Sequence, residues 1–190
     1  MSVRILGLET LYKGWLALHR ATLCGDDGQT FVREIEHHGQ GVAVLPYDPQ
    51  RRLALMVRLP RAPVIWAGGP QTLIEAPAGV VEAGEDPAGC ARREALEEAG
   101  VQLGDLEPVA RAWPMPGVST ELMHLFLAPY DAADRVAGGG GVDGEHENIV
   151  VQEMPLAALA RAADDGGLAD LKTLALVLAL RLRRPDLFRP

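Results

Sequence analysis

Apolar and polar residues alternate along much of the first half of the chain, the two-residue period of a β-strand. The period predicts four strands, at residues 14–24, 30–37, 41–48 and 51–59. Turn residues separate the first two strands, so we expect them to form an N-terminal hairpin. Residues 62–72 are rich in Gly and Pro and are predicted to be a loop, and residues 73–79 a short strand.

The second half mixes strands with helices. Further strands are predicted at residues 107–115, 121–130 and 149–155, with a glycine-rich loop at 137–148. Two helices are predicted to close the chain, at residues 156–164 and 171–184. Strands that surround one central helix, with helices after them, predict a mixed-sheet α/β domain.

The central helix has clear ends. Asp86 is a good N-cap, Pro87 suits the first helical position, and Gly100 suits the position just after the last turn. A stripe of small residues lets this helix lie close against a sheet, and it consists of Ala88, Ala91, Ala95 and Ala99.

Three carboxylates converge beside that stripe. Glu94, Glu97 and Glu98 fall within an arc of about 100°. Arg93 lies four residues before Glu97 and is placed to pair with it. Like charges at helical spacing destabilise a helix by a few tenths of a kcal/mol per pair. Composition alone leaves two interpretations open, a solvated acidic surface or a functional cluster.

Composition limits the classes of partner. The net charge is −8 and the basic residues are scattered, which argues against nucleic acid as the main partner. No apolar run approaches the length of a membrane span, and residues 1–15 lack an export signal, so we expect a cytoplasmic protein. Cys24 and Cys90 are far apart in the sequence and are expected to be reduced thiols.

The spacing around the central helix resembles a known motif. Gly79 is followed after five residues by Glu85, and after seven more by the run Arg93-Glu94-Ala95-Leu96-Glu97-Glu98-Ala99-Gly100-Val101. This matches each fixed position of the Nudix box, so the chain is identified as resembling the Nudix hydrolase superfamily.

The resemblance implies a fold, a reaction and a metal site. The fold would be an α/β/α sandwich with a mixed sheet, and the reaction would cleave a nucleoside diphosphate linked to another group, with Mg²⁺ or Mn²⁺. Hard divalent cations prefer oxygen ligands, which a face of carboxylates supplies. By position, Glu94, Glu98 and the carbonyl of Ala78 would bind metal, and Glu97 would help to bind a second ion. Arg93 and Glu85 would orient the helix and the preceding loop.

The flanking segments resemble one branch of that superfamily. Pro116, inside a Pro-Gly…Thr-Glu stretch, resembles the ADP-ribose pyrophosphatases, whereas residues 119–126 and the long connection 61–75 resemble bacterial GDP-mannose hydrolases more closely. The implied substrate is a nucleoside diphosphate sugar, with ADP-ribose as the first choice and GDP-mannose as the alternative.

The late glycine-rich loop is expected to complete the site. In this branch a glutamate there completes the metal site or takes a proton from the attacking water. The pattern Glu145-His146-Glu147-Asn148 aligns Glu147 with that position and leaves Glu145 as an alternative. His146 is expected to be incidental. We expect the glycines at 138–141 to make this loop mobile, and Glu97 is the next candidate for the base.

The resemblance also implies substrate contacts. Trp15 would stack on the nucleobase, although it would equally suit a core or a dimer interface. Arg61 would bind the diphosphate, with Arg58 as a fallback and a structural salt bridge as the alternative for either. The remaining expected contacts are Arg33, Glu34, Gly79 and Glu121.

In these relatives the N-terminal hairpins exchange between subunits. We therefore expect a homodimer in which residues 1–38 supply dimer and substrate contacts and residues 39–190 form the Nudix hydrolase domain. Two other classes remain as alternatives. One is a Nudix domain that senses a nucleotide sugar without hydrolysing it, and the other is an interaction protein whose acidic helix is only a surface.

Overall fold

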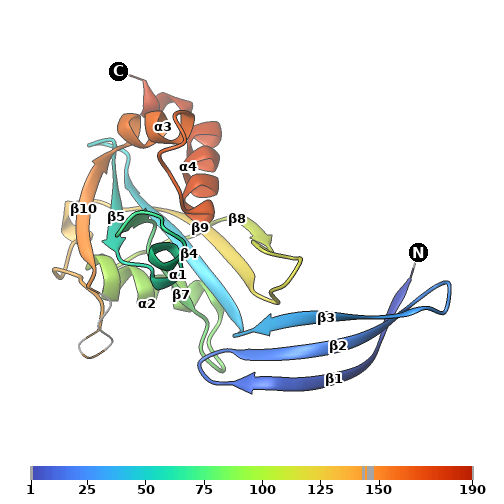
Figure 1. Ribbon diagram of the computed structural model, residues 1–190. Coiled ribbons are helices and arrows are strands. Elements are labelled where there is room, and N and C mark those ends of the chain that lie inside the picture. The colour runs from blue at the N-terminus through green and yellow to red at the C-terminus, as the bar shows by residue number, and fades with distance from the viewer. Residues whose placement is uncertain (1, 143, 145–147, 190) are drawn as a thin grey trace. The chain divides into compact units, whose positions relative to one another are not determined.

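The computed structural model describes residues 2–142, 144 and 148–189. Its internal contacts divide the chain into two compact units. The first unit comprises residues 1–40 and 112–123, and the second comprises residues 41–111 and 124–190. Strands and helices are labelled in Figure 1.

The first unit is built on a three-stranded antiparallel sheet. Its strands are β1 (Val3–Lys13), β2 (Ala17–Gly25) and β3 (Thr30–His37), in the order β1-β2-β3. The pairing of β2 with β3 confirms the predicted hairpin. Strand β1 was not predicted. Its pairing with β2 shifts register between Ile5 and Gly7 and again between Thr10 and Tyr12, which interrupts the two-residue period that the prediction used.

The second unit contains the main sheet. Its strand order is β10-β5-β4-β9-β8, with β6 paired to β5 and β7 paired to β4. The bounds are β4 (Gln40–Asp48), β5 (Leu53–Leu59), β6 (Leu73–Glu75), β7 (Ala78–Val80), β8 (Glu107–Ala112), β9 (Leu122–Pro129) and β10 (Val150–Pro155). Residues 41–48 of β4 are all buried, as expected for a strand covered on both faces.

Four α-helices accompany this sheet within the described residues: α1 (Ala62–Trp66), α2 (Pro87–Ala99), α3 (Leu156–Asp164) and α4 (Leu171–Arg183). Short 3₁₀ turns lie at Ala132–Asp134 and Pro185–Phe188. Figure 1 shows β4, β5 and β9 between α2 on one side and the α3–α4 pair on the other. The α/β class with a mixed sheet is therefore confirmed.

Helix α1 corrects one prediction, because it lies in the segment that was predicted to be loop. Pro63 falls in its first turn, where a missing N–H costs no hydrogen bond. Its last residue, Trp66, is 91% exposed and is therefore not a core residue.

The core between α2 and the sheet depends on small helix residues. Ala91, Ala95 and Ala99 are fully buried, and they pack with Val42 and Leu55 among others. Because alanine projects little, the helix axis lies close to the sheet, as the predicted stripe requires. The close approach fixes where the other side chains of α2 stand.

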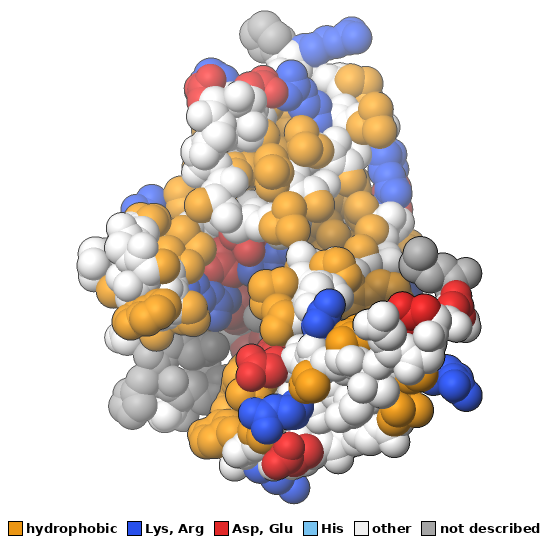
Figure 2. All heavy atoms as spheres, turned by 45° about the vertical axis from the view of Figure 1, so that its right-hand side comes forward, with side chains coloured by type: hydrophobic (Ala, Val, Ile, Leu, Met, Phe, Trp, Pro, Cys, Tyr) orange, Lys and Arg blue, Asp and Glu red, His pale blue; other side chains and the backbone are white. Residues whose placement is uncertain are grey.

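Strand β1 and helix α4 both carry several exposed apolar side chains. Strand β1 is exposed along its whole length and includes Ile5, Leu6 and Leu8, while α4 exposes Leu178 and Leu182. Figure 2 shows hydrophobic side chains grouped in its upper part, where Figure 1 places α3 and α4. Within the described residues, no helix combines the length and the apolar character that crossing a membrane requires.

Candidate active site

The helix that carries the acidic residues begins and ends as predicted. Asp86 accepts hydrogen bonds from the N–H groups of Ala88 at 2.9 Å and Gly89 at 3.0 Å, which caps the first turn. Gly100 ends the helix with φ at +67°, a left-handed conformation that favours glycine. These caps fix where α2 begins and ends, and its buried alanine face fixes the direction of its carboxylates.

Glu98 and Glu94 both meet strand β7. Glu98 is 3% exposed, and its Oε2 accepts a hydrogen bond of 2.9 Å from the N–H of Ala78. Glu94 lies over Gly79 so closely that a Cβ there would stand 1.8 Å from Glu94 Oε1. Glycine at position 79 therefore makes room for the Glu94 carboxylate. The structure brings together Ala78, Gly79, Glu94 and Glu98, four of the residues that the sequence analysis selected.

Arg93 orders the remaining carboxylates around this pair. Its Nε and Nη2 donate to the two oxygens of Glu85, each at 3.0 Å. Its Nη1 donates to Glu94 at 2.8 Å and to Glu97 at 3.1 Å. The hydrogen bonds from Arg93 lower the pKa of Glu85 to about 2, so Glu85 stays ionised near neutral pH. Arg93 and Glu85 therefore orient the loop and the helix, and one cation partly compensates the acidic cluster.

The donor set fits a hard divalent cation. Glu94 and Glu98 supply carboxylate oxygens from neighbouring turns of α2, next to the main chain of Ala78 and Gly79. Mg²⁺ typically takes one or two protein carboxylates and keeps several waters. Three or more His, Cys, Asp or Glu side chains grouped to hold a metal ion do not occur among the described residues. Glu94 and Glu98 are the residues that could hold such a cation, together with water molecules.

The glycine-rich segment packs on the end of α2. The N–H of Gly140 donates to the carbonyl of Glu98 at 2.8 Å, and that of Gly141 donates to the carbonyl of Glu97 at 3.0 Å. A Cβ on Gly139 would lie 2.4 Å from the Glu98 carbonyl oxygen. The glycines thus permit close packing against the helix and satisfy its last carbonyls.

This packing gives Gly139, Gly140 and Gly141 a structural role in addition to the mobility expected from the sequence. They anchor the start of the late loop directly behind Glu97 and Glu98. The two predicted loop carboxylates, Glu145 and Glu147, lie outside the described residues, as does His146.

Arg61 forms an ion pair with a buried glutamate. Its Nε and Nη2 donate to the two oxygens of Glu75, at 2.8 and 2.9 Å. The side chain of Glu75 is 1% exposed, whereas that of Arg61 is 40% exposed. The structural salt bridge that the sequence left open is therefore present. The Arg61 side chain as a whole remains partly accessible to solvent.

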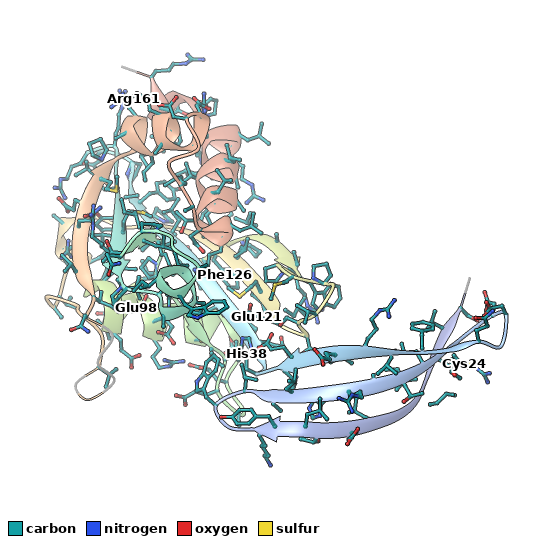
Figure 3. The ribbon with its side chains drawn as sticks, in the orientation of Figure 1. Cys24, His38, Glu98, Glu121, Phe126 and Arg161 are labelled. Carbon is teal, nitrogen blue, oxygen red and sulfur yellow. The ribbon has the colours of Figure 1, made fainter. Side chains whose placement is uncertain are left out.

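The first unit contains a second cluster, centred on His38. The rings of Trp15 and His38 stack with centroids 5.0 Å apart. His38 Nε2 lies 3.2 Å from Glu121 Oε1, and Nδ1 is hydrogen-bonded to Glu36. Figure 3 labels His38 and Glu121 close together. The structure thus links two predicted substrate contacts, Trp15 and Glu121, through a histidine that sequence reasoning missed.

The charge of His38 follows from these neighbours. Burial by itself would lower the pKa of His38, but its hydrogen bonds to Glu36 and Glu121 raise the pKa above its usual 6.5. Burial would likewise raise the pKa of Glu36, but hydrogen bonds from Ser119 and His38 lower it below 4.5. The signal for His38 in the sequence was its position directly after His37, the last residue of strand β3.

Arg33 and Glu34 lie on the middle of β3. Arg33 stands over the ring of Phe31, with its guanidinium carbon 4.9 Å from the ring centroid, and donates to the carbonyl of Val32. Glu34 is exposed and faces Arg20 across the β2–β3 pair. These contacts connect neither residue to the His38 cluster.

Comparisons with known proteins agree with this arrangement. The NUDIX domain model matches residues 37–176. A GDP-mannose pyrophosphatase of Cronobacter sakazakii is 36% identical over 188 residues, covering 96% of this chain and 97% of that protein. A GDP-mannose pyrophosphatase of Yersinia enterocolitica is 35% identical over 184 residues, covering 93% and 95%.

A solved structure gives the same fold. The crystal structure of an ADP compounds hydrolase superposes with a TM-score of 0.78 at 18% identity, covering 98% of this chain and 96% of that chain. The shared fold, the family match over most of the chain and relatives that span nearly its whole length confirm the resemblance read from the motif. The chain belongs to the NUDIX family and is a Nudix hydrolase.

Proposed function

We propose that this hydrolase cleaves the diphosphate linkage of a nucleoside diphosphate sugar, giving a nucleoside monophosphate and a sugar phosphate. The observation that carries the proposal is the placement of Glu94 and Glu98 against the Ala78–Gly79 main chain, with Arg93 ordering the neighbouring carboxylates. Mg²⁺ is the proposed metal and Mn²⁺ the alternative, because both prefer such oxygen ligands.

The residues divide the chemistry among them. Glu94, Glu98 and the Ala78 carbonyl would hold the cation, and Glu97 would support a second one. A bound divalent ion neutralises charge on the diphosphate and acidifies the attacking water. Glu147 is the proposed base for that water, with Glu145 as the alternative. Arg61, held by Glu75, would offer its exposed edge to the diphosphate.

The names of the relatives help to rank the substrates. Two relatives that match this chain over nearly its full length are GDP-mannose pyrophosphatases, which favours GDP-mannose as the first substrate to test. ADP-ribose, the first choice from the sequence, is the second. The net charge of −8 argues against a nucleic-acid substrate.

The N-terminal residues are proposed to bind substrate and a second subunit. Trp15, which is 77% exposed, has surface free for a nucleobase beyond its contact with His38. Glu121 would bind sugar hydroxyls, and Arg33 and Glu34 would contact substrate across a homodimer. Residues 1–38 would form that dimer, residues 39–190 would carry the hydrolase, and the protein would act in the cytoplasm.

A substrate screen tests the proposed function. Purified protein with Mg²⁺ is incubated with GDP-mannose, ADP-ribose, ADP-glucose, NADH and diadenosine polyphosphates, and the products are separated by chromatography. We expect a mononucleotide and a sugar phosphate from the sugar nucleotides. Exclusive hydrolysis of a compound other than a sugar nucleotide would contradict the proposal. Tight binding of a sugar nucleotide without hydrolysis would indicate the sensor alternative.

A further inference from the structure

The segment that joins β6 to β7, residues 75–78, is held firmly at its start. The Glu75 carboxylate is buried and accepts hydrogen bonds from Arg61, at 2.8 and 2.9 Å, and from Lys172. Burial alone would raise the pKa of Glu75, but Arg61 and Lys172 lower it below its usual 4.5. Glu75 is therefore an ionised anchor, and Lys172 ties it to the first turn of helix α4.

Thr173, also in the first turn of α4, binds the next residue of the segment, Ala76. Thr173 is fully buried, and its Oγ1 accepts a hydrogen bond of 2.7 Å from the N–H of Ala76. The hydroxyl therefore donates its own proton to Asp170 Oδ2, 2.6 Å away. Asp170 also caps α4 by accepting from the Thr173 N–H at 2.9 Å, so the orientation of the hydroxyl is fixed.

The other end of the segment reaches the acidic helix. The N–H of Val44, in the central strand β4, donates to the Pro77 carbonyl at 3.0 Å. The N–H of Ala78 donates to Glu98 Oε2 at 2.9 Å. Four residues of main chain therefore connect the first turn of α4 to the carboxylate of Glu98, with a polar contact at each residue.

We propose that Thr173 is a positioning residue for the metal site. Its hydroxyl fixes Ala76, and the short segment, which has a hydrogen bond at each residue, passes this constraint to Ala78, which in turn orients the Glu98 carboxylate. Groups that orient a metal ligand in this way affect metal affinity although they do not touch the ion. The inference rests on the proposed function, because it takes Glu98 as a metal ligand.

Thr173→Val tests the inference, because it replaces the hydroxyl by a methyl group and leaves the buried Ala76 N–H without an acceptor. In the full-length chain we expect the dissociation constant for Mn²⁺, measured by electron paramagnetic resonance, to rise about 10- to 100-fold. Amide hydrogen exchange at Ala78, measured by NMR without metal, should become faster. Thr173→Ser keeps the hydroxyl and should restore both values.

Leu180→Val separates positioning from general destabilisation. Leu180 is fully buried on α4, about two turns beyond Thr173, so the change should lower the melting temperature. It should leave Mn²⁺ affinity and Ala78 exchange at their wild-type values. If Leu180→Val changes both as strongly as Thr173→Val does, the role of Thr173 is only structural.

Wild-type Mn²⁺ affinity and Ala78 exchange in a folded Thr173→Val variant would overturn the inference. If that variant does not fold, Thr173→Ala gives the same readouts with a smaller side chain. Glu98→Gln distinguishes the inference from the proposed function, since it should abolish Mn²⁺ binding. If it does not, the metal assignment is wrong, and Ala78 exchange in Thr173→Val alone decides whether Thr173 positions the segment.

Discussion

Arg93 in the second unit and His38 in the first each compensate a group of carboxylates, but the two side chains differ in how they hold their charge. Each places a cationic side chain among carboxylates: Arg93 contacts Glu85, Glu94 and Glu97, and His38 contacts Glu36 and Glu121. Arginine stays charged at every pH that a protein meets, whereas histidine titrates near neutrality.

Because of this difference, the two clusters contribute to stability over different ranges of pH. The pKa of Glu85 is lowered to about 2, so the stability that its ionised form adds is complete above 4.5 and lost only as the pH falls toward 2. The pKa of His38 is raised, so its contribution is complete below 6.5 and is lost as the pH rises through the higher folded value. The charges around the acidic helix therefore stay in place near neutral pH, whereas those of the Trp15–His38 cluster depend on the pH.

The largest expected effect comes from neutralising a carboxylate of the acidic helix α2. Glu94→Gln and Glu98→Gln should each lower kcat by several orders of magnitude, because each removes a charged ligand from an essential cation. Both variants should stay folded, since relief of like-charge repulsion offsets the lost contacts. Steady-state kinetics in Mg²⁺ and a thermal melt measure the two effects.

Glu82→Gln is the matched control for these variants. Glu82 is exposed on the preceding loop, and the change removes the same charge. It should leave kcat close to the wild-type value. Full activity of either helix variant in Mg²⁺ would refute the metal assignment.

The late-loop carboxylate ranks second. If Glu147 takes the proton of the attacking water, Glu147→Gln should lower kcat by about 10²- to 10⁴-fold and change KM much less. Glu145→Gln is the matched control and should be mild. The reverse result would shift the assignment by two residues, and no effect from either would make Glu97 the next candidate.

The role of the first unit is tested at its exposed strand. Leu8 in β1 is 59% exposed. If β1 lies in a dimer interface, Leu8→Glu buries an unpaired charge there and should weaken the dimer by about 10²-fold or more. Sedimentation velocity measures the assembly, and kinetics should show a higher KM if the dimer supplies substrate contacts.

Thr10→Glu adds the same charge at a polar position of the same strand and should perturb the dimer less. Deleting residues 1–38 should also give a monomer or an aggregate with poor substrate affinity. An active, monomeric truncation would exclude the shared site.

A smaller effect is expected from substitution of Gly139, which packs against the end of α2. Gly139 has φ at +70°, and a Cβ there would lie 2.4 Å from the Glu98 carbonyl oxygen. Gly139→Ala should therefore lower the free energy of unfolding by about 1–3 kcal/mol and slow turnover. Gly138→Ala, where a Cβ meets no atom within 4 Å, is the control and should be nearly neutral. Equal effects from both would mean that flexibility, and not close packing, explains the glycines.

The smallest effect concerns the titratable cluster itself. For the wild type, KM should rise as the pH increases through the raised pKa of His38, because Glu36, Glu121 and Trp15 lose a charged partner. His38→Gln should flatten this dependence and raise KM at low pH by about tenfold or less, the equivalent of one charge-assisted hydrogen bond.

His19→Gln makes the same chemical change on β2 and serves as the control. Its side chain is hydrogen-bonded to Thr10 in β1. If His38→Gln keeps the wild-type dependence of KM on pH, titration of His38 does not affect substrate binding.

The sequence by itself determined the local elements and the chemistry of the acidic helix. Alternation predicted most strands, and the Asp86 cap and Gly100 predicted both ends of α2, because these signals depend only on neighbouring residues. The spacing of Gly79, Glu85, Arg93, Glu94 and Glu98 identified the family for the same reason. Strand β1 was missed because register shifts in its pairing interrupt the period, and α1 because its segment is rich in Gly and Pro.

The tertiary structure decided which distant residues meet. The sequence gives no local signal that Thr173 accepts from Ala76, that Glu75 anchors Arg61 and Lys172, or that His38 joins Trp15 to Glu121. These contacts link residues far apart in the chain, and their partners are chosen by how strands and helices pack. The same packing places Gly139, Gly140 and Gly141 against the end of α2, and only the folded chain shows how closely their backbone approaches that helix.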